Sequence, residues 1–308
     1  MNILLNCFLL SLGFLLLVKG ADWFVDGASG IATKLRIPQL VIGLTIVAMG
    51  TSAPEAAVSI SAALKGSAEI TIGNIVGSNI LNILIILGLA SAIVPIAVAK
   101  STLQVDIPFM LVITGILLVL GRDGTISFVD GLTMLILFTG YLGFLFIGAK
   151  NNPTEEPVKA MPMWKALILT AIGLCLIILG ADFAVDAATA LARIFGMSER
   201  FIGLTIVALG TSLPELFTSV SAARKGNADI AIGNIVGSNI FNILFIVGLS
   251  ALIVPVPFAD PFRIDTVIAI GAGIVLLIFA LPRKKLVRWH GPAMLALYGI
   301  YLGWLLMV

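Results

Sequence analysis

The sequence has little charge for its length. Of its 308 residues only 11% are Asp, Glu, Lys or Arg, whereas a soluble domain carries about 25%. Hydrophobic residues make up 60%, more apolar surface than a soluble globule can bury. Apolar stretches of roughly 20 residues cross a ~30 Å hydrocarbon core as helices. The composition excludes a soluble domain and predicts an all-α polytopic membrane protein, with the lipid bilayer as its surroundings.

Cysteine and histidine are almost absent. Cys7 and Cys175 lie inside apolar stretches and do not occupy matching places in the repeat described below. Neither a disulfide framework nor a thiolate metal site is therefore expected. The single histidine, His290, opens the last apolar stretch, where an interfacial side chain is commoner than a proton relay. No nucleophile with a base and no nucleotide motif is present, so an enzyme or a cofactor is not expected.

Clusters of basic residues are missing as well. The 18 basic and 16 acidic residues give a net charge of +2 and lie mostly at the ends of apolar stretches or in short loops. Nucleic acid is therefore not an expected partner. The first apolar stretch, Ile3 to Val18, lacks the basic start of a signal peptide and continues through Lys19 into Asp22 and Asp26. We interpret it as a retained first helix.

The chain contains an internal repeat. Residues 42–95 align with 202–255 at a constant offset of 160, and 38 of the 54 pairs are identical, so the whole chain is interpreted as a duplication. The repeats are expected at 1–148 and 162–308, with the most similar regions at 43–82 and 203–242. The polar, proline-containing segment 149–161 is the expected linker. Ten transmembrane helices are predicted near 2–25, 39–64, 70–95, 105–121, 128–148, 162–187, 199–224, 230–254, 263–281 and 289–308.

An odd number of helices in each repeat has a topological consequence. With five in each half, the second half enters the membrane from the opposite side, which gives two inverted five-helix repeats. Placing the amino terminus outside puts 13 of the 18 Lys and Arg residues on the cytoplasmic side and 5 outside, as the positive-inside rule requires. We therefore expect a multi-pass protein of the cell membrane with both termini extracellular and a cytoplasmic linker.

Each half carries one glutamate inside an apolar segment. The motifs are Gly-Thr-Ser-Ala-Pro-Glu at 50–55 and Gly-Thr-Ser-Leu-Pro-Glu at 210–215. An ionisable residue at such a position costs at least roughly 2.5 to 3.5 kcal/mol, so it normally faces a partner, a cavity or an ion. A buried base as partner is not favoured, because the next basic residues in these segments are Lys65 and Arg224. Glu55 and Glu215 are therefore expected to face each other.

The proline before each glutamate supports an ion site. Pro54 cannot donate to the carbonyl of Gly50, and its ring opens that turn of the helix. In lipid, a freed carbonyl is tolerated only where it lines a protected cavity or binds something. A break of this kind next to a carboxylate predicts a cation site more strongly than a packing kink.

A second motif follows each glutamate. It reads Gly-Asn-Ile-Val-Gly-Ser-Asn-Ile-Leu-Asn at 73–82 and differs at one position in 233–242. Ser78 and Asn82 are four residues apart and share a helix face, as Thr51 and Glu55 do, so two faces rich in oxygen can meet. The glycines alone indicate close helix packing. A structural hydrogen bond between helices remains an alternative to ion coordination for the amides, which are Asn74, Asn79, Asn82, Asn234, Asn239 and Asn242.

The combined donor set contains only oxygen. Besides two carboxylates, amides and freed carbonyls it includes the hydroxyls of Thr51, Ser52, Ser78, Thr211, Ser212 and Ser238. Ca²⁺ takes six to eight oxygen ligands in flexible geometry, while transition metals favour nitrogen or sulfur. A hard cation such as Ca²⁺ or Na⁺ fits best.

The two negative charges also suggest exchange. A site of charge −2 in a low dielectric is unfavourable when empty, so it is expected to move loaded with one Ca²⁺, with two or more Na⁺, or with two protons. An antiporter follows from this requirement. A Ca²⁺/H⁺ antiporter with the same glutamates and, less favoured by the paired acids, a passive cation channel remain alternatives.

Both motif pairs resemble the alpha repeats of the sodium/calcium exchanger branch of the cation/Ca²⁺ antiporter superfamily, in its compact prokaryotic form. The resemblance covers essentially the whole chain. It implies exchange of Na⁺ for Ca²⁺ by alternating access, with Ca²⁺ extrusion and net charge movement. It also implies that helices two, three, seven and eight form the ion-binding core, while helices one and six form a long tilted pair that slides past it.

The resemblance further implies a ligand set. Some members carry an aspartate at the position of Asn242, which is associated with K⁺; because Asn82 and Asn242 are both amides here, no K⁺ dependence is expected. No protein partner is implied, and a monomer is expected. Carried over by motif position, the ligands are the carbonyls of Ala48 and Ala208 and the side chains of Thr51, Ser52, Glu55, Ser78, Asn82, Thr211, Ser212, Glu215, Ser238 and Asn242.

Overall fold

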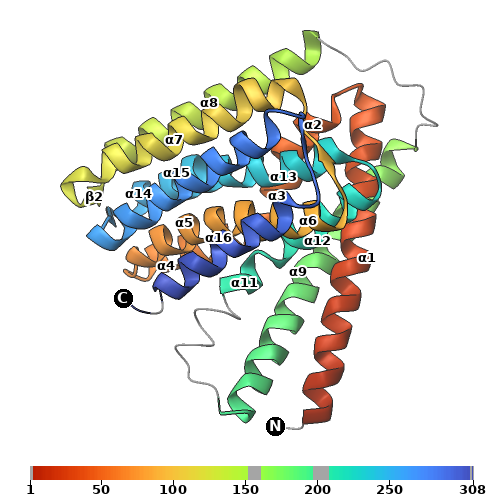
Figure 1. Cartoon of the computed structure of the whole chain (residues 1–308), viewed down its shortest axis with the longest axis horizontal. Helices are drawn as coiled ribbons and strands as arrows, with labels where there is room; N and C mark the ends of the chain where they lie inside the picture. The colour runs from red at the N-terminus through yellow and green to blue at the C-terminus, as the bar shows by residue number, and fades with distance from the viewer. Residues whose placement is uncertain (1–2, 152–160, 197–207, 306, 308) are drawn as a thin grey trace.

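The structure, a computed structural model, describes residues 3–151, 161–196, 208–305 and 307 and consists mainly of long helices (Figure 1). Within these residues seven helices are long and apolar enough to cross a membrane, or eight if one bent pair is counted as a single span. The all-helical prediction is confirmed. The seven segments are α1 (Ile3–Leu35), α5 with η2 and α6 (Glu69–Leu81, Asn82–Leu87, Gly88–Ile93), η3 with α7 and η4 (Thr102–Asp106, Ile107–Leu120, Gly121–Asp123), α8 (Phe128–Asn151), α9 (Met163–Ile194), α13 with η6 and α14 (Ala228–Phe241, Asn242–Val247, Gly248–Ile253) and α15 (Asp260–Ala280).

Shorter helices complete the described part of the chain. Parts of two predicted segments cannot be compared, because residues 199–207 of the seventh predicted helix and 152–160 of the predicted linker lie outside the described residues. The shorter helices are α2 (Gln39–Ile42), η1 (Gly43–Val47), α3 (Ala48–Thr51), α4 (Ala53–Leu64), α11 (Ala208–Thr211), α12 (Leu213–Arg224) and α16 (His290–Leu305).

Helices α1 and α9 extend beyond their predicted ends at residues 25 and 187. The sequence suggested an end near Asp26 because charge normally marks the edge of a membrane span. In the structure Asp22 and Asp26 contact Lys225, which follows α12, and α1 continues past them to Leu35. The two acids therefore belong to a helix face and do not end the helix.

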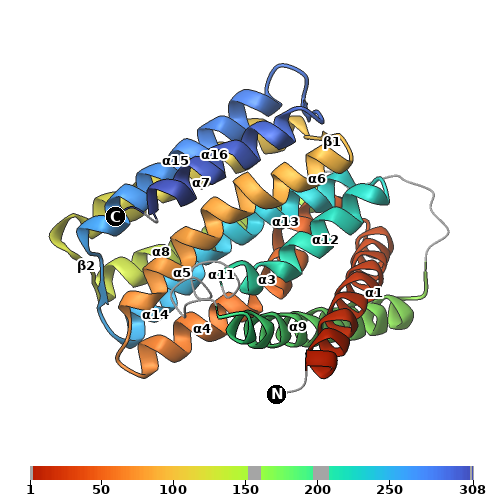
Figure 2. The same cartoon turned by 60° about the horizontal axis from the view of Figure 1, so that its bottom comes forward.

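Glycines bring α1 and α9 into close antiparallel contact (Figures 1 and 2). A Cβ added at Gly13 would lie 2.8 Å from the carbonyl oxygen of Gly180, and one at Gly20 would lie 2.8 Å from that of Gly173. Because rising numbers on α1 meet falling numbers on α9, the helices run in opposite directions. Small residues on facing helices permit this backbone approach within a membrane.

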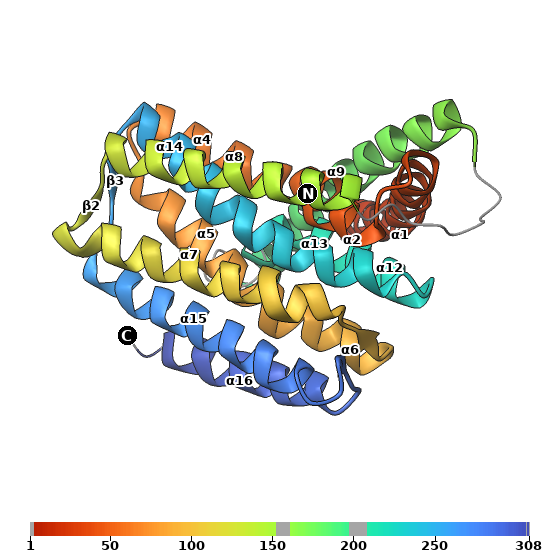
Figure 3. The ribbon, with the colours of Figure 1, turned by 90° about the horizontal axis from the view of Figure 1, so that it is seen from above.

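The most deeply buried helices are α5 and α13. In the most apolar 18-residue stretch of Glu69–Ile93 and of Ala228–Ile253, 78% and 83% of the stretch is buried inside the protein. In the other five candidate spans this share is 22% to 39%. Figure 3 shows α5 and α13 inside the bundle, with α1 and α9 at one end. Polar side chains on these two helices are therefore the ones most shielded from both lipid and water.

Two pairs of very short strands connect loops from the two halves. β1 (Ile96–Ala97) pairs antiparallel with β4 (Lys285–Leu286), and β2 (Thr125–Ile126) pairs with β3 (Val256–Pro257). The two pairs are related by the offset of 160, since β1 corresponds to β3 and β2 to β4. Each half thus supplies one strand to each pair.

Helical irregularities concentrate near the motifs. The segments Gln39–Thr51 and Ala53–Leu64 form the bent pair, with an angle of 50° between them. Wider π-helical turns begin at Gly43, Asn82 and Asn242, and such turns often accompany functional sites. The backbone is therefore least regular where the sequence carries its polar groups.

Candidate ion-binding site

The two glutamates lie at equivalent helix starts. Ser52 interrupts the second predicted helix, and Glu55 lies in the first turn of α4. Ser212 and Glu215 hold the same positions in α12. Proline is favoured in the first turn of a helix, where its missing N–H would have no partner, and the positive end of the helix dipole stabilises a carboxylate there. Both glutamates are nevertheless only 1% exposed.

Each glutamate is bound by the serine of the opposite half. Ser52 Oγ donates to Glu215 Oε1 at 2.8 Å, and Ser212 Oγ donates to Glu55 Oε1 at 3.3 Å. Both serines occupy the N-cap position of their helix, yet neither makes a capping hydrogen bond. The hydroxyls are thus directed across the interface, and each carboxyl group contacts the opposite half of the chain.

The second oxygen of each carboxylate has no partner. Within the described part of the chain, Glu55 Oε2 and Glu215 Oε2 are buried and make no hydrogen bond. The ion pairs among the described residues involve Lys225 and Arg263, and neither glutamate takes part in one. Two buried carboxylates without a basic partner are unfavourable in a low dielectric unless a cation neutralises them.

Four asparagines connect the continuous segments α5–η2 and α13–η6. Asn79 Nδ2 donates to the carbonyl oxygen of Asn239 at 3.1 Å, and Asn239 Nδ2 donates to that of Asn79 at 3.2 Å. Asn82 Nδ2 donates to Asn239 Oδ1, and Asn242 Nδ2 donates to Asn79 Oδ1, each at 3.0 Å. The side-chain oxygens of Asn82 and Asn242 have no partner among the described residues. Both the structural hydrogen bond and the free oxygen expected for these two amides are therefore present together.

A second pair of asparagines supports the glutamate backbone. Asn74 Nδ2 donates to the carbonyl oxygen of Glu55 and to Ser59 Oγ. Asn234 Nδ2 makes the equivalent bonds to the carbonyl of Glu215 and to Ser219 Oγ. These amides hold the helix starts in place and do not direct their oxygens at the carboxylates.

The remaining predicted ligands surround the same region. Thr51 Oγ1 donates to Asn234 Oδ1 at 2.9 Å, and Ser238 Oγ approaches the carbonyl oxygen of Ala48 at 3.4 Å. Thr211 Oγ1 is buried without a hydrogen-bond partner among the described residues, and Ser78 is buried on α5. Ala208 is the first described residue of α11, and its surroundings lie outside the described residues. Every predicted side chain whose surroundings are described thus lies in the core formed by α3, α4, α5, η2, α11, α12, α13 and η6.

A cavity of about 440 Å³ borders this core. It lies between α4 and α9, next to α11, and is lined by Ala53, Pro54, Ala57, Asp182, Asp186 and Thr211, among others. Pro54 precedes Glu55 in the sequence, and Thr211 is itself one of the predicted ligands. The cavity therefore lies beside the site and exposes two carboxylates of α9 that the sequence analysis did not single out.

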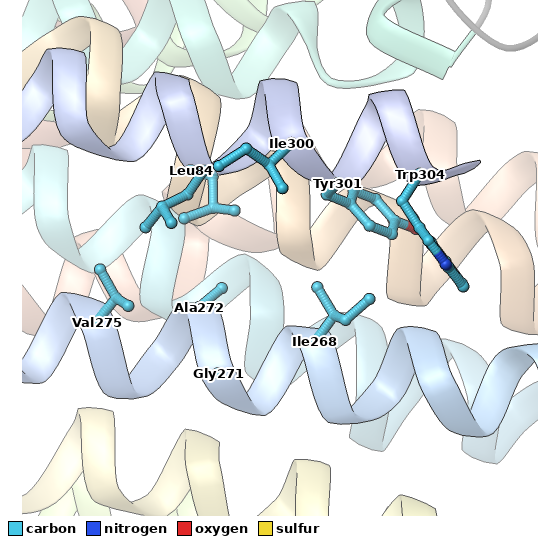
Figure 4. A pocket seen from close by; sticks show the side chains of 9 residues that line it. Leu84, Ile268, Gly271, Ala272, Val275, Ile300, Tyr301 and Trp304 are labelled. Atoms are coloured by element: carbon cyan, nitrogen blue, oxygen red, sulfur yellow. The ribbon is translucent and has the colours of Figure 1, made fainter. Parts of the chain in front are cut away.

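A second cavity, of about 520 Å³, has no relation to the carboxylates. It lies between α15 and α16 and is lined almost entirely by apolar side chains such as Ile268, Val275 and Ile300, with Tyr301 and Trp304 at one end (Figure 4). Its lining offers no carboxylate. The volume of a cavity therefore does not identify the site here, and the polar groups do.

Asn79 and Asn239 were left open between packing and function by the sequence. Asn79 lies three residues before Asn82, and Asn239 three before Asn242, so the sequence places each pair on one helix face. What the sequence could not give is the crossing of α5 and α13 that lets each amide reach the opposite half.

Comparison with known proteins is consistent with this geometry. A family model described as sodium/calcium exchanger protein matches the chain twice, over residues 5–147 and 165–307. The putative antiporter CaxA of Alkalimonas amylolytica is 40% identical over 286 residues and covers 90% of each chain. The sodium/calcium exchanger MaX1 of Methanosarcina acetivorans is 33% identical, with 97% of this chain and 98% of that protein covered.

Solved structures give the same relationship. A structure of the sodium-calcium exchanger NCX_Mj superposes with a TM-score of 0.87 at 36% identity, covering 99% of this chain and 100% of that one. The likeness extends over both halves and is not confined to the two motifs.

Proposed function

Because the chain belongs to the sodium/calcium exchanger family of antiporters, we propose that it exchanges Na⁺ for Ca²⁺ across the cell membrane by alternating access. The observation that carries this proposal is the group of four buried, unpaired oxygens on Glu55, Glu215, Asn82 and Asn242. Two carboxylates and two amides, contributed equally by two repeats, provide a site for a divalent oxygen-seeking cation.

The full ligand set extends beyond these four oxygens. Ca²⁺ takes six to eight oxygen ligands, so further hydroxyls and carbonyls must complete the shell. The groups we assign to this role are the side chains of Ser52, Ser212, Thr51, Thr211, Ser78 and Ser238 and the carbonyls of Ala48 and Ala208. We include all of them in the proposed site, with the serines exchanging their bonds to the glutamates for bonds to the ion.

Exchange follows from the charge of this site. One Ca²⁺ neutralises the two carboxylates, and so do two Na⁺, whereas the bare site carries −2 into a low dielectric when it changes sides. The site therefore moves only when it is loaded. If three Na⁺ replace one Ca²⁺, one net charge crosses in each cycle, and the membrane potential contributes about 2.3 kcal/mol per 100 mV. An inward Na⁺ gradient then drives Ca²⁺ extrusion.

The architecture proposed for this cycle is ten transmembrane helices in two inverted repeats, 1–148 and 162–308, joined by a cytoplasmic linker at 149–161. The antiparallel packing of α1 on α9 supports the inversion. The equivalent strand pairs β1–β4 and β2–β3 support a two-fold relation between the halves. Both termini are placed outside the cell, and a single chain is sufficient because both acids come from it.

A flux experiment tests the proposal. Proteoliposomes loaded with Na⁺ and diluted into Na⁺-free buffer with ⁴⁵Ca²⁺ should accumulate the isotope, and a protonophore should leave this uptake unchanged. Loss of uptake with the protonophore, together with uptake driven by a pH gradient, would assign the Ca²⁺/H⁺ antiport. Uptake that is independent of any internal counter-ion would assign a passive channel.

A further inference from the structure

We propose that Asn79 and Asn239 are positioning residues that fix the side-chain orientation of Asn242 and Asn82 in the ion site. The proposal deepens the proposed function and rests on it. Each amide of the site could present either its oxygen or its NH₂ group to a cation, and only the oxygen binds. Something must therefore hold the oxygen inward in a site whose side chains are buried.

Backbone carbonyls set the direction of this arrangement. A carbonyl oxygen only accepts, so Asn79 must direct its Nδ2 at the carbonyl of Asn239, at 3.1 Å. Its Oδ1 is then left to accept from Asn242 Nδ2, at 3.0 Å. Asn242 is thereby held with its NH₂ group occupied and its oxygen free. The same sequence of bonds runs from the carbonyl of Asn79 through Asn239 to Asn82.

The cross-connection carries a specific consequence. Asn79, in the first repeat, orients the amide of the second, and Asn239 orients the amide of the first. Without Asn79 the side chain of Asn242 has no fixed acceptor for its NH₂ group and can turn that group toward the cation. A carboxylate at position 242 has no such choice of orientation, because both of its oxygens accept.

Substitution at both positions tests the assignment. Asn79→Ala is expected to raise the Kd for ⁴⁵Ca²⁺ of the purified protein about tenfold, the size of one misdirected hydrogen bond. In an Asn242→Asp background the same substitution should change Kd by less than about twofold, since the carboxylate needs no orienting partner. Asn239→Ala provides the matched control, because it should retain its full effect in the Asn242→Asp background and lose it only with Asn82→Asp.

A conservative variant separates positioning from packing. Asn79→Asp keeps an acceptor for Asn242 but sets a carboxylate oxygen against the Asn239 carbonyl, so it should bind Ca²⁺ more tightly than Asn79→Ala without needing to match the parent. An effect of Asn79→Ala that is equal in both backgrounds, or binding by Asn79→Asp as weak as that of Asn79→Ala, overturns the assignment. Absence of Ca²⁺ binding by the parent protein would instead overturn the proposed function.

From a separate observation we infer that Lys225 with Asp22 and Asp26 forms a latch that closes one side of the protein, and that Lys65 with Asp182 and Asp186 forms its counterpart in the opposite conformation. Lys225 Nζ lies 2.7 Å from Asp26 Oδ1 and 3.8 Å from Asp22 Oδ1, and it donates to the carbonyl oxygen of Asp22 at 2.7 Å. These contacts hold the end of α12 against α1.

Two further hydrogen bonds extend the same contact. Ser221 Oγ donates to Asp22 Oδ1 at 2.6 Å, and Asn227 Nδ2 donates to Ser29 Oγ at 3.0 Å. The α1 residues Asp22, Asp26 and Ser29 follow the spacing of one helix face. One continuous polar seam therefore joins α1 to α12 and the turn that follows it.

The other half has equivalent residues at all six positions. The offset of 160 converts the α1 residues of the seam into Asp182, Asp186 and Thr189 on α9, and the α12 side into Ser61, Lys65 and Ser67 on and after α4. In the described structure Thr189 Oγ1 is buried without a partner, and the ion pairs formed among the described residues do not include Lys65. Between α4 and α9 lies instead the cavity of about 440 Å³ lined by Asp182 and Asp186.

The two acidic pairs lie at different heights along the α1–α9 pair. Since Gly20 of α1 meets Gly173 of α9 in antiparallel packing, Asp22 lies level with residue 171. Asp182 is eleven residues further along α9, which corresponds to roughly 16 Å. The latch of Lys225 is closed near Asp22, whereas the cavity beside Asp182 is open about three helical turns away. A protein that alternates between two conformations requires one side closed while the other is open.

Cysteine labelling tests the latches without any transport measurement. With Cys7 and Cys175 replaced by alanine, Ala57→Cys reports on the cavity, and Phe217→Cys reports on the equivalent position of α12. Lys225→Ala is expected to raise maleimide labelling of the Phe217→Cys variant about fivefold and to lower that of the Ala57→Cys variant, the size expected for an ion pair that is partly exposed.

Lys65→Ala is the matched control and should shift both labelling rates in the opposite direction. Lys225→Asp combined with Asp26→Lys should return the rates part of the way to those of the parent, because it restores the ion pair between positions 225 and 26 but not the bond from Lys225 to the Asp22 carbonyl. Equal shifts from Lys225→Ala and Lys65→Ala, or no change in the ratio of the two rates, overturn the latch. Failure of Ca²⁺ exchange leaves these labelling results interpretable, so the two proposals fail separately.

Discussion

Glu55 and Glu215 each bind a serine from the opposite half with one oxygen and leave the other oxygen unpaired. A fully hydrogen-bonded carboxylate would be stable without an ion, whereas a carboxylate with no hydrogen bonds would be hard to keep buried and charged. The observed arrangement lies between these limits. It keeps the site formed while leaving acceptor capacity for a cation.

Replacing either acid by its amide tests this balance. Glu55→Gln or Glu215→Gln should abolish exchange, because one lost unit of charge near the cation removes on the order of 4 kcal/mol, or roughly a thousandfold in affinity. The melting temperature without Ca²⁺ should not fall, since the repulsion between the two carboxylates is relieved. Flux and thermal unfolding of the same preparations provide the measurement.

Glu69→Gln is the control for that substitution, since Glu69 is exposed at the start of α5. It should exchange at the rate of the parent protein. Normal exchange by either of the two buried variants would remove the glutamates from the proposed site.

Potassium sensitivity is a second test at the residue scale. Asn82 and Asn242 donate through their Nδ2 atoms to other amides, and neither adds a negative charge. The site therefore has charge −2, which one Ca²⁺ balances. No further negative charge remains for K⁺ to neutralise. Na⁺-dependent ⁴⁵Ca²⁺ uptake should be the same when external choline is replaced by K⁺ with the potential clamped, and a clear K⁺ requirement would contradict this account of the charge.

The sequence predicted the acids but not their hydrogen bonds. A glutamate in an apolar segment is recognisable from its desolvation cost alone. That Ser52 binds Glu215 and not Glu55 depends on how α3 and α12 cross, which no spacing within either motif determines. The pairing of Asn79 with Asn242 was out of reach for the same reason, because local periodicity determines a helix face but not the residues that meet it.

At the scale of elements, the contact between α1 and α9 depends on glycines. A Cβ at Gly20 would lie 2.8 Å from both the carbonyl oxygen of Gly173 and the backbone nitrogen of Ile177, and a backbone cannot yield as a flexible side chain can.

The length of α1 escaped sequence analysis because its charged residues resemble the end of a span. The π-helical turns at Asn82 and Asn242 escaped it because the composition of a π turn does not distinguish it from an α-helix.

Substitution at this contact predicts a loss of stability. Gly20→Leu should lower the free energy of unfolding by about 1 to 3 kcal/mol, the usual cost of overpacking, and should reduce exchange because α1 and α9 no longer fit together. Gly140→Leu on α8 is the control, since a Cβ there meets nothing within 4 Å. Denaturation of both variants in detergent provides the measurement, and equal stability of the two would show that the close approach has no structural importance.

At the scale of the whole molecule, contacts between the halves restrict which loops share a side. β1 pairs with β4, which places the loop after α6 beside the loop after α15. Arg263 donates to the carbonyl oxygen of Arg122 and so joins the start of α15 to the loop after α7. Both contacts agree with ten spans, because an even number of predicted spans separates the residues of each. The sequence predicts an odd number of spans in each repeat, but it does not predict these contacts.

The orientation in the membrane then depends on the distribution of basic residues, and one span is sufficient to test it. Arg122 and Lys150 lie at opposite ends of α8, and both are exposed. The predicted orientation, with 13 Lys and Arg residues on the cytoplasmic side and 5 outside, puts Lys150 in the cytoplasm and Arg122 outside. In a background without Cys7 and Cys175, a membrane-impermeant maleimide should label Arg122→Cys in intact cells and Lys150→Cys only in inside-out vesicles. The reverse pattern would invert the orientation and direct the open cavity beside Asp182 toward the cytoplasm, whereas labelling of both variants from one side would show that α8 does not cross the membrane.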